Sequence, residues 1–291
     1  MASLKEIRGR INSVTNTRKI TGAMKMVSSA KLHRAQDAIM RFYPYWKKIS
    51  GIMDVYLENN GGEDLSILTK QRKVGRLAIV AFSSNSSLCG VFNANVQKKL
   101  SEVLAGYSAV SPKNISLYLI GKKIYEEFTK KKSDYAIKGA FAELADKPNY
   151  EGMNVITNEL LKRFFENDVD RMEIIYNKFK NTAIQSITHE PLLPITLAET
   201  TGKKENTNYI IEPNPQQLLE ALIPSVIRLQ MYRVMLNSYA SEHGARTTAM
   251  QIATDNADEL INNLVIQYNK LRQDAITKEI IDIVGGTEVF R

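Results

Sequence analysis

The sequence is poor in cysteine and histidine, and it has no long hydrophobic run. Its 291 residues include one cysteine, Cys89, which excludes an internal disulfide and fits a reducing compartment. No apolar stretch reaches the roughly 18 residues that a transmembrane helix needs, so we expect no such helix. The opening residues MASLKEIRGR lack the apolar core of a secretory signal, and we expect them to belong to the fold.

The short motifs of common catalytic and cofactor sites are also missing. The chain contains no GxxxxGK[ST], no GxGxxG after its first expected strand and no HExxH. Its three histidines, His33, His189 and His243, lie in distant segments, which makes a shared metal site improbable. We therefore expect no catalytic residue, no cofactor and no metal.

Positive charge is in excess, with a net charge of +8, and it is unevenly spread. Residues 1–48 hold eleven Lys and Arg against two acidic residues, whereas residues 215–291 hold seven against nine. These opposite biases favour pairing of the two segments, and the surplus predicts an acidic partner. The basic residues of the first segment form no continuous stripe, which disfavours nucleic-acid binding.

Both ends of the chain show the alternating 3-4 spacing of a helix that buries one seam. The N-terminal seam positions are Leu4, Ile7, Ile11, Val14, Arg18, Thr21, Lys25, Ser28, Leu32, Ala35, Ile39 and Phe42. Those near the C-terminus are Ala257, Ile261, Leu264, Tyr268, Leu271 and Ala275. We expect a long antiparallel coiled coil that protrudes from a small domain, because a helix of about 55 residues spans about 80 Å.

Cap and proline residues refine the expected helix bounds. Ser3 and Glu6 form a capping box, which predicts that the first long helix begins at Leu4. Pro44 is expected to kink or divide this helix, and Pro224 to bend the second one, because proline removes a backbone hydrogen bond.

Between the two ends the pattern changes to strands that alternate with helices. Expected strands lie at 76–82, 115–120, 135–137 and 172–179, and expected helices at 93–107, 122–131 and 154–167. The segment 184–195, which two prolines interrupt, is expected to be an edge strand. This alternation predicts an α/β domain with a mainly parallel sheet. The expected division is therefore a coiled-coil helix at 1–58, a central domain at 70–198 and a pairing helix at 214–286.

The loop after the first expected strand is a candidate for chemistry. Its residues, SSNSSLCG at 83–90, stand where parallel sheets bind ligands, and small polar side chains there could hold a phosphate. Cys89 could act as a nucleophile, but a cysteine without a nearby basic residue is usually an inert buried thiol. We favour the inert thiol and keep, as the alternative function, an α/β enzyme with a helical dimerisation arm.

The middle of the N-terminal seam is polar, which a two-stranded coiled coil seldom tolerates. Three explanations stay open: the packing face rotates there, a third body contacts the polar side, or the heptad pattern stutters locally. The polar positions are Arg18, Thr21, Lys25 and Ser28, and an apolar stripe runs beside them at Ile20, Ala23, Met24 and Val27.

Five segments resemble the gamma subunit family of F-type ATP synthases, in that family's order along the chain. They are INSVTNTRKITGAMKMVSSAKL at 11–32, SLCGVFN at 87–93, SEHGARTTAMQIATDNA at 241–257, YNKLRQDAIT at 268–277 and EIIDIVGG at 279–286. The resemblance implies a non-catalytic central-stalk rotor. Its terminal helices would form an antiparallel coiled coil along the axis of a hexamer of α and β subunits, with a central Rossmann-like domain at the foot.

The resemblance also implies partners and a location. The foot would contact the epsilon subunit and the c-subunit ring, with one copy of the chain per complex. Proton flow would turn the ring and the shaft, and the shaft would force the β subunits through their states in sequence. We expect a peripheral protein on the cytoplasmic face of the bacterial plasma membrane, since no N-terminal extension suggests an imported organellar precursor.

Eight residues are assigned by the resemblance to contacts with the α/β hexamer. They are Met24, Lys25, Arg246, Arg272, Gln273, Thr277, Ile283 and Val284. Arg272 and Gln273 match a pair that contacts a loop of the β subunit. Ile283 and Val284 match an apolar tip that turns in a bearing at the top of the hexamer.

The sequence departs from the family pattern at one turn and in its cysteine count. The family often has Asp-Arg-Gly before Leu-Cys-Gly, where this chain has Asn85, Ser86 and Ser87. We expect this turn to lie away from the shaft. Photosynthetic members carry a redox cysteine pair, whereas Cys89 stands alone here, so thiol control of that type is not expected.

Overall fold

The computed structural model describes residues 3–59, 68, 70–130, 134–182, 184–195 and 215–288. The chain divides into two compact units, one formed by 1–28 with 247–291 and the other by 29–246. The elements are α1 (Leu4–Asn59), β1 (Leu77–Phe82), α2 (Phe92–Gly106), a 3-10 turn (Pro112–Asn114), β2 (Ile115–Ile120), α3 (Lys122–Lys130), β3 (Ala136–Ile137), α4 (Ala142–Asp146), α5 (Tyr150–Phe165), β4 (Arg171–Phe179), β5 (Gln185–Leu193) and α6 (Pro215–Glu288).

A five-stranded sheet in the order β3-β2-β1-β4-β5 forms the centre of the unit 29–246. β1 pairs in parallel with β2 and β4, and β2 pairs in parallel with β3. β5 is antiparallel to β4 and lies at the edge, which confirms the expected edge strand. The α/β fold with a mainly parallel sheet is thus confirmed.

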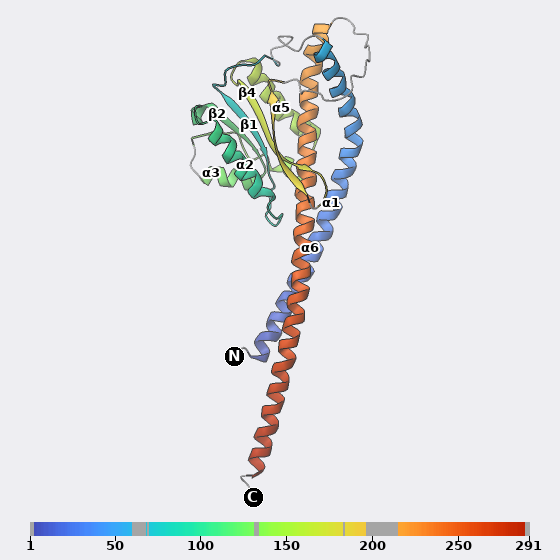
Figure 1. Cartoon of the computed structure of the whole chain (residues 1–291), viewed down its shortest axis with the longest axis vertical. Coiled ribbons are helices and arrows are strands. Elements are labelled where there is room, and N and C mark those ends of the chain that lie inside the picture. The colour runs from blue at the N-terminus through green and yellow to red at the C-terminus, as the bar shows by residue number, and fades with distance from the viewer. Residues whose placement is uncertain are drawn as a thin grey trace. The chain divides into compact units, whose positions relative to one another are not determined.

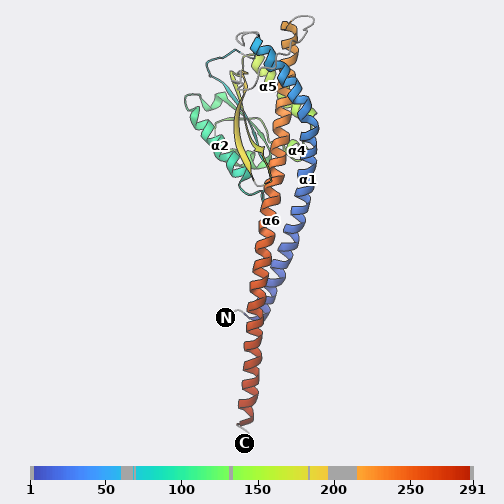
Figure 2. The ribbon, with the colours of Figure 1, turned by 45° about the vertical axis from the view of Figure 1, so that its right-hand side comes forward.

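The sheet separates two apolar layers, which Figures 1 and 2 show as helices on both of its faces. Leu77 and Ile79 of β1 pack with α2 and α3, whereas Ala78 and Val80 pack with α5 and α6. All four side chains are fully buried. A parallel strand covered on both faces reads as a continuous apolar run, which is why β1 was predictable from its sequence.

The start of α5 differs from the expected helix at 154–167. The helix begins at Tyr150, because the side chain of Asn149 accepts a hydrogen bond from the backbone N–H of Gly152 at 2.6 Å. This N-cap satisfies one of the free donors at the helix start, four residues before the expected position. The helix ends at Phe165, two residues before Asn167, whose φ of 59° is left-handed. The short helix α4 was not predicted.

Of the two outcomes predicted for Pro44, division of the first helix is wrong, since α1 continues through it to Asn59, and a kink stays a prediction. Contacts with α6 hold the helix on both sides of the proline. Phe42 packs edge-on against Tyr232 with ring centroids 5.1 Å apart, and Arg233 lies over Trp46 at 4.4 Å. Such packing offsets the hydrogen bond that proline removes. The predicted start of α1 is confirmed by Ser3 Oγ, which accepts from the N–H of Glu6 at 3.2 Å.

The strand-to-helix loop after β2 requires glycine at position 121. Gly121 has φ of +104°, and a Cβ there would lie 2.4 Å from the carbonyl oxygen of Ser83. Only glycine lets the two backbones approach so closely. This contact holds the loop after β1 against the loop after β2, at the carboxyl end of the sheet.

Candidate partner-contact site

Polar side chains of α1 and α6 meet in pairs in the unit formed by 1–28 and 247–291. In each pair the two residue numbers add to 275 or 276, which is the pattern of antiparallel helices in one register. The pairs are Arg18 Nη1 to Asp258 Oδ1 at 2.7 Å, Thr21 Oγ1 to Thr254 Oγ1 at 2.9 Å, and Lys25 Nζ to Gln251 Oε1 at 2.6 Å.

The apolar part of the same seam confirms the predicted C-terminal spacing. Ala257 and Leu264 are buried, and the four other predicted positions are partly buried, namely Ile261, Tyr268, Leu271 and Ala275. Every other side chain from 259 to 280 is exposed. The heptad pattern therefore identified the packing face of this segment.

Burial excludes two of the three explanations for the polar seam. Thr21 is 8% exposed and Ser28 3%, whereas Ile20 is 60% exposed and Val27 59%. The packing face therefore does not rotate onto the apolar stripe. The 3-4 spacing of buried residues continues at Leu32, so no stutter interrupts it. Arg18, Thr21 and Lys25 contact polar side chains of α6. That a third body also contacts the polar side stays a prediction.

The two α1 residues assigned to partner contacts are both half-buried. The ammonium group of Lys25 is bound to Gln251 within the chain. A lysine ammonium carries three donors, so two remain for other partners. Arg18 and Arg10 are likewise paired inside the chain, with Asp258 and Glu6. Part of the positive charge of the N-terminal segment is thus neutralised by acidic residues of the same chain.

Arg272, Gln273 and Thr277 lie on exposed positions of α6. Within the described part of the chain, none of the three forms a hydrogen bond or an ion pair. An apolar stripe runs beside them at Ile276, Ile280 and Ile283, which are 48%, 55% and 68% exposed. Val284 lies in α6, and its side chain is outside the described residues, as are Val289 and Phe290.

The end of α6 that carries these residues has no α1 residue opposite it. The polar pairs set Leu4, the first residue of α1, opposite about residue 271. Figure 1 shows the C-terminal end of α6 extending past the N-terminal end of α1. An exposed apolar stripe on a helix without a partner is typical of a docking surface.

Arg246 lies in the other unit, and its guanidinium is bound by three residues of the chain itself. It is 6% exposed. Nη1 donates to Glu242 Oε1 at 2.7 Å and to His243 Nδ1 at 3.3 Å. Nη2 donates to Ser86 Oγ at 2.9 Å and to the Ser86 carbonyl at 3.4 Å. The expectation that the turn at 85–87 lies away from the long helices is therefore wrong, because Arg246 belongs to α6.

Burial shifts the pKa values of the ionisable groups around Arg246. It raises the pKa of Glu242 above its ordinary value, although Arg246 acts in the opposite direction. Burial, with the positive charges of Arg246 and Lys31, lowers the pKa of His243 to about 3. His243 is therefore neutral at physiological pH and accepts a hydrogen bond from Arg246.

The loop at 83–90 is filled by the chain's own side chains. Asn93 Oδ1 accepts from the N–H of Ser84 at 3.1 Å, and Asn93 Nδ2 donates to Cys89 Sγ at 3.2 Å. Cys89 is 1% exposed, which confirms the expected buried thiol, and burial raises the pKa of that thiol although Arg246 acts in the opposite direction. A cavity nearby, lined by Ser83 and Glu242 among others, measures about 10 Å³. That volume suits one water molecule and excludes a nucleotide.

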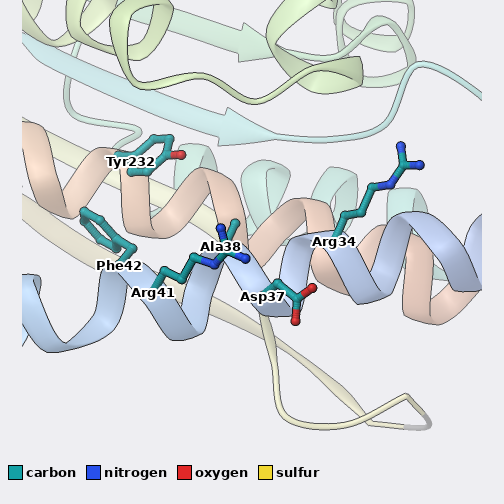
Figure 3. Close-up of a pocket in the computed structure, with 6 residues that line it drawn as sticks. All are labelled: Arg34, Asp37, Ala38, Arg41, Phe42 and Tyr232. Atoms are coloured by element: carbon teal, nitrogen blue, oxygen red, sulfur yellow. The ribbon is translucent and has the colours of Figure 1, made fainter.

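A larger hollow of about 530 Å³ lies between α1 and α6 in the same unit. Figure 3 shows its lining, with the Tyr232 ring above Phe42 and the carboxylate of Asp37 directed away from Tyr232. Arg34 and Arg41 supply two exposed cations. It holds no nucleophile beside a base, so it offers no catalytic constellation.

The histidines occupy three unrelated environments. His33 is exposed, His243 is buried beside Arg246, and His189 Nε2 lies 2.8 Å from Glu173 Oε2. Across the described residues, no three His, Cys, Asp or Glu side chains gather as metal ligands would. None of the helices in the described ranges combines the length and the apolar character needed to cross a bilayer.

Glu242 and Ser86 are functional candidates that the sequence did not indicate. They lie 156 positions apart and meet only through Arg246. The one local signal was the i, i+4 spacing of Glu242 and Arg246, which favours an ion pair on a helix.

The whole chain matches a family model described as ATP synthase, over residues 3–289. The ATP synthase gamma chain of Phocaeicola vulgatus is 47% identical over 292 residues, with 99% of each chain covered. That of Bacteroides fragilis is 48% identical over 294 residues, again covering 99% of each chain. That of Flavobacterium johnsoniae is 41% identical over 290 residues, covering 100% of this chain and 99% of the relative.

Solved structures show the same fold at lower identity. A chain of the Euglena gracilis mitochondrial ATP synthase, in a structure of OSCP, F1 and c-ring, superposes with a TM-score of 0.65 at 18% identity. The match covers 99% of this chain and 94% of that one. A chain of the rotor from the same organism gives a TM-score of 0.62 at 18% identity, covering 94% and 98%.

Proposed function

Because this chain belongs to the ATP synthase gamma-chain family, we propose that it is the non-catalytic central-stalk rotor of an F-type ATP synthase. The paired α1 and α6 turn inside a hexamer of α and β subunits, where ATP is made or hydrolysed. The α/β domain contacts the epsilon subunit and the c-subunit ring, which proton flow drives. One copy serves each complex, peripheral to the cytoplasmic face of the bacterial plasma membrane.

The observation that carries this proposal is the full-length match to gamma chains at 40–48% identity. The structure supports it through the polar pairs between α1 and α6. A shaft that transmits torque must not let its helices slide past each other. Polar side chains paired within a seam specify one register, since any shift would leave buried polar groups unpaired.

We propose that each of the expected segments of the chain has its own role in the rotor. The coiled-coil helices at 1–58 and 214–286 form the shaft, and the domain at 70–198 forms the foot. We propose that this domain is non-catalytic, because polar groups of the loop at 83–90 are bonded to Asn93 and Arg246 of the chain itself.

The proposed contacts with the hexamer fall into three groups. Arg272, Gln273 and Thr277 are exposed on α6 and free to bind a loop of the β subunit. Ile283 and Val284 belong to the bearing at the end of α6. The remaining contacts are proposed at Met24 and Lys25 beside the polar seam, and at Arg246, which acts through the turn that it holds.

A native purification tests this function. The tagged chain is isolated from its own cells under mild conditions, and ATP hydrolysis is assayed on the eluate. Co-purification of two larger nucleotide-binding subunits in three copies each, with ATPase activity, supports the rotor. Recovery of the chain alone or as a homodimer would contradict it.

A further inference from the structure

Three consecutive residues of the loop after β1 tie it to three different parts of the fold. Ser84 bonds to Asn93 of α2. Asn85 Oδ1 accepts from the N–H of Lys122 at the start of α3, at 3.0 Å. Ser86 accepts from Arg246 of α6 through its hydroxyl and its carbonyl. Of these three residues, Ser86 is the one that reaches a long helix.

The residue of α6 that Ser86 contacts belongs to a buried ion pair. The side chains of Arg246 and Glu242 are 7% and 9% exposed. A buried guanidinium is costly unless all of its donors are bonded. Glu242 balances its charge, and the two oxygens of Ser86 take the donors on its other side. Ser86 is itself exposed, so it links the exposed loop to a buried ion pair.

The loop that this tie holds is strained and presents apolar side chains. Leu88 has φ of +66°, a left-handed conformation that is strained for a leucine. Its side chain is 58% exposed, and that of Val91 is 66% exposed. Such strain persists only where the surroundings over-determine the backbone, and it often marks a functional surface.

We infer that Ser86 is a positioning residue that makes the loop 83–91 and α6 move as one body. The inference rests on the proposed rotor function, in which force on the α/β domain must reach the long helix. The contact is short, because a serine hydroxyl lies close to its own backbone. It is anchored on a guanidinium that Glu242 also binds. Without this contact, a force on the loop would move the loop relative to α6 before it turned the helix.

The serine side chain suits this contact, because its hydroxyl accepts from Arg246. An arginine at position 86 would have no side-chain acceptor for Arg246 and would bring a second cation beside it. The hydroxyl of Ser86 removes that repulsion and supplies the acceptor. Asn85 likewise has an uncharged amide, whose oxygen accepts from the N–H of Lys122 at the start of α3.

Three variants test the inference in the assembled enzyme. Ser86→Ala removes the hydroxyl, Ser86→Thr keeps it, and Ser87→Ala is the matched control, because the exposed Ser87 has no hydrogen bond within the described residues. Protons pumped per ATP hydrolysed are measured in membrane vesicles. Amide exchange is measured at 88–91 and compared with that of helix α2.

We expect Ser86→Ala to lower the pumping ratio about threefold while hydrolysis stays within twofold, and to raise amide exchange at 88–91 about fivefold. Ser86→Thr should restore both values, and Ser87→Ala should leave them unchanged. If the role of Ser86 were merely structural, ATP hydrolysis and proton pumping would fall together. Ser86→Thr and Ser86→Ala would then give the same values.

Unchanged pumping and exchange in Ser86→Ala would overturn the inference and leave the rotor proposal standing. Failure of the unmodified chain to form an ATPase-active complex would overturn the rotor proposal itself. In that case the exchange comparison still decides whether Ser86 holds the loop, and an unchanged rate would reject the tie.

Discussion

The hydroxyl oxygens of Thr21 and Thr254 lie 2.9 Å apart across the seam between α1 and α6. One hydroxyl donates to the other across the seam, and the accepting hydroxyl can donate to its own helix, Thr21 to the carbonyl of Arg18 or Thr254 to that of Met250. The pair thus joins two helices at a polar layer where a coiled coil normally has apolar side chains. This layer and its two neighbours fix the register of the segment.

The register predicts a disulfide at this layer. Thr21→Cys with Thr254→Cys should cross-link within one chain on mild oxidation, since hydroxyls 2.9 Å apart set the two Cβ atoms within disulfide reach. A shift in mobility on a non-reducing gel reports it. Cys89 is buried and should not compete.

The control for this cross-link pairs Val27→Cys with Thr254→Cys. Val27 is 59% exposed and belongs to the outer stripe, so its side chain faces away from the seam. Equal yields in the two double variants would show that α1 and α6 do not hold the register described.

The two ion pairs on α6 should differ greatly in their effect on stability. Glu242→Gln leaves Arg246 buried without its counter-charge, which should lower the free energy of unfolding by about 3–5 kcal/mol. Asp258→Asn breaks an exposed pair with Arg18 and should cost less than about 1 kcal/mol. Urea denaturation of both variants measures the difference. Similar losses would mean that Arg246 is not buried as described.

His243 should make the chain less stable as the pH falls. Its pKa is lowered to about 3 in the folded protein, against about 6.5 in an unfolded chain, so the unfolded state binds the proton first. Stability is therefore full above pH 6.5 and declines between pH 6.5 and 3. Between pH 7 and 5, where few carboxylates titrate, His243→Gln should flatten this decline.

His33→Gln serves as the control for that measurement, because His33 is exposed on α1. It should leave the pH dependence of the unfolding midpoint unchanged. The account would be contradicted if the loss of stability at low pH persisted in His243→Gln and vanished in His33→Gln. That result would mean that protonation of His33, not of His243, destabilises the chain.

Substitution of Arg272 and Gln273 by alanine should impair coupling without unfolding the chain. Both side chains are exposed and unpaired among the described residues, so the free energy of unfolding should change by less than about 0.5 kcal/mol. ATP-driven proton pumping by the assembled enzyme should fall severalfold. The exposed pair Asn262 and Asn263, changed to alanine on the same helix, should leave pumping intact, and equal effects would remove the special role of Arg272 and Gln273.

Local patterns predicted the elements because the forces that form them act over a few residues. The 3-4 spacing located the buried face of α6 at Ala257, Leu264 and their neighbours, and the apolar run at β1 located a strand covered on both faces. The start of α5 was misplaced although its signal was present, since Asn149 before Tyr150 is an N-cap.

Contacts between distant segments were beyond the reach of these patterns. The polar seam positions were identified, but nothing local to Thr21 indicates that Thr254 stands opposite it. The contact between Ser86 and Arg246 joins residues 160 positions apart, and a turn that departs from the family pattern gave no reason to expect it. Such contacts depend on how the chain closes, and only the three-dimensional structure reveals them.

The most direct test of the rotor is to watch the chain turn. Ser101 is exposed on α2, and Cys89 is buried, so Ser101→Cys offers a selective attachment point for a bead on the α/β domain. The chain is assembled with its own α and β subunits, and the hexamer is fixed to a surface. Rotation of the bead in one direction while ATP is hydrolysed is the result expected of a rotor. Steady ATP hydrolysis by an intact complex whose bead does not rotate would contradict it.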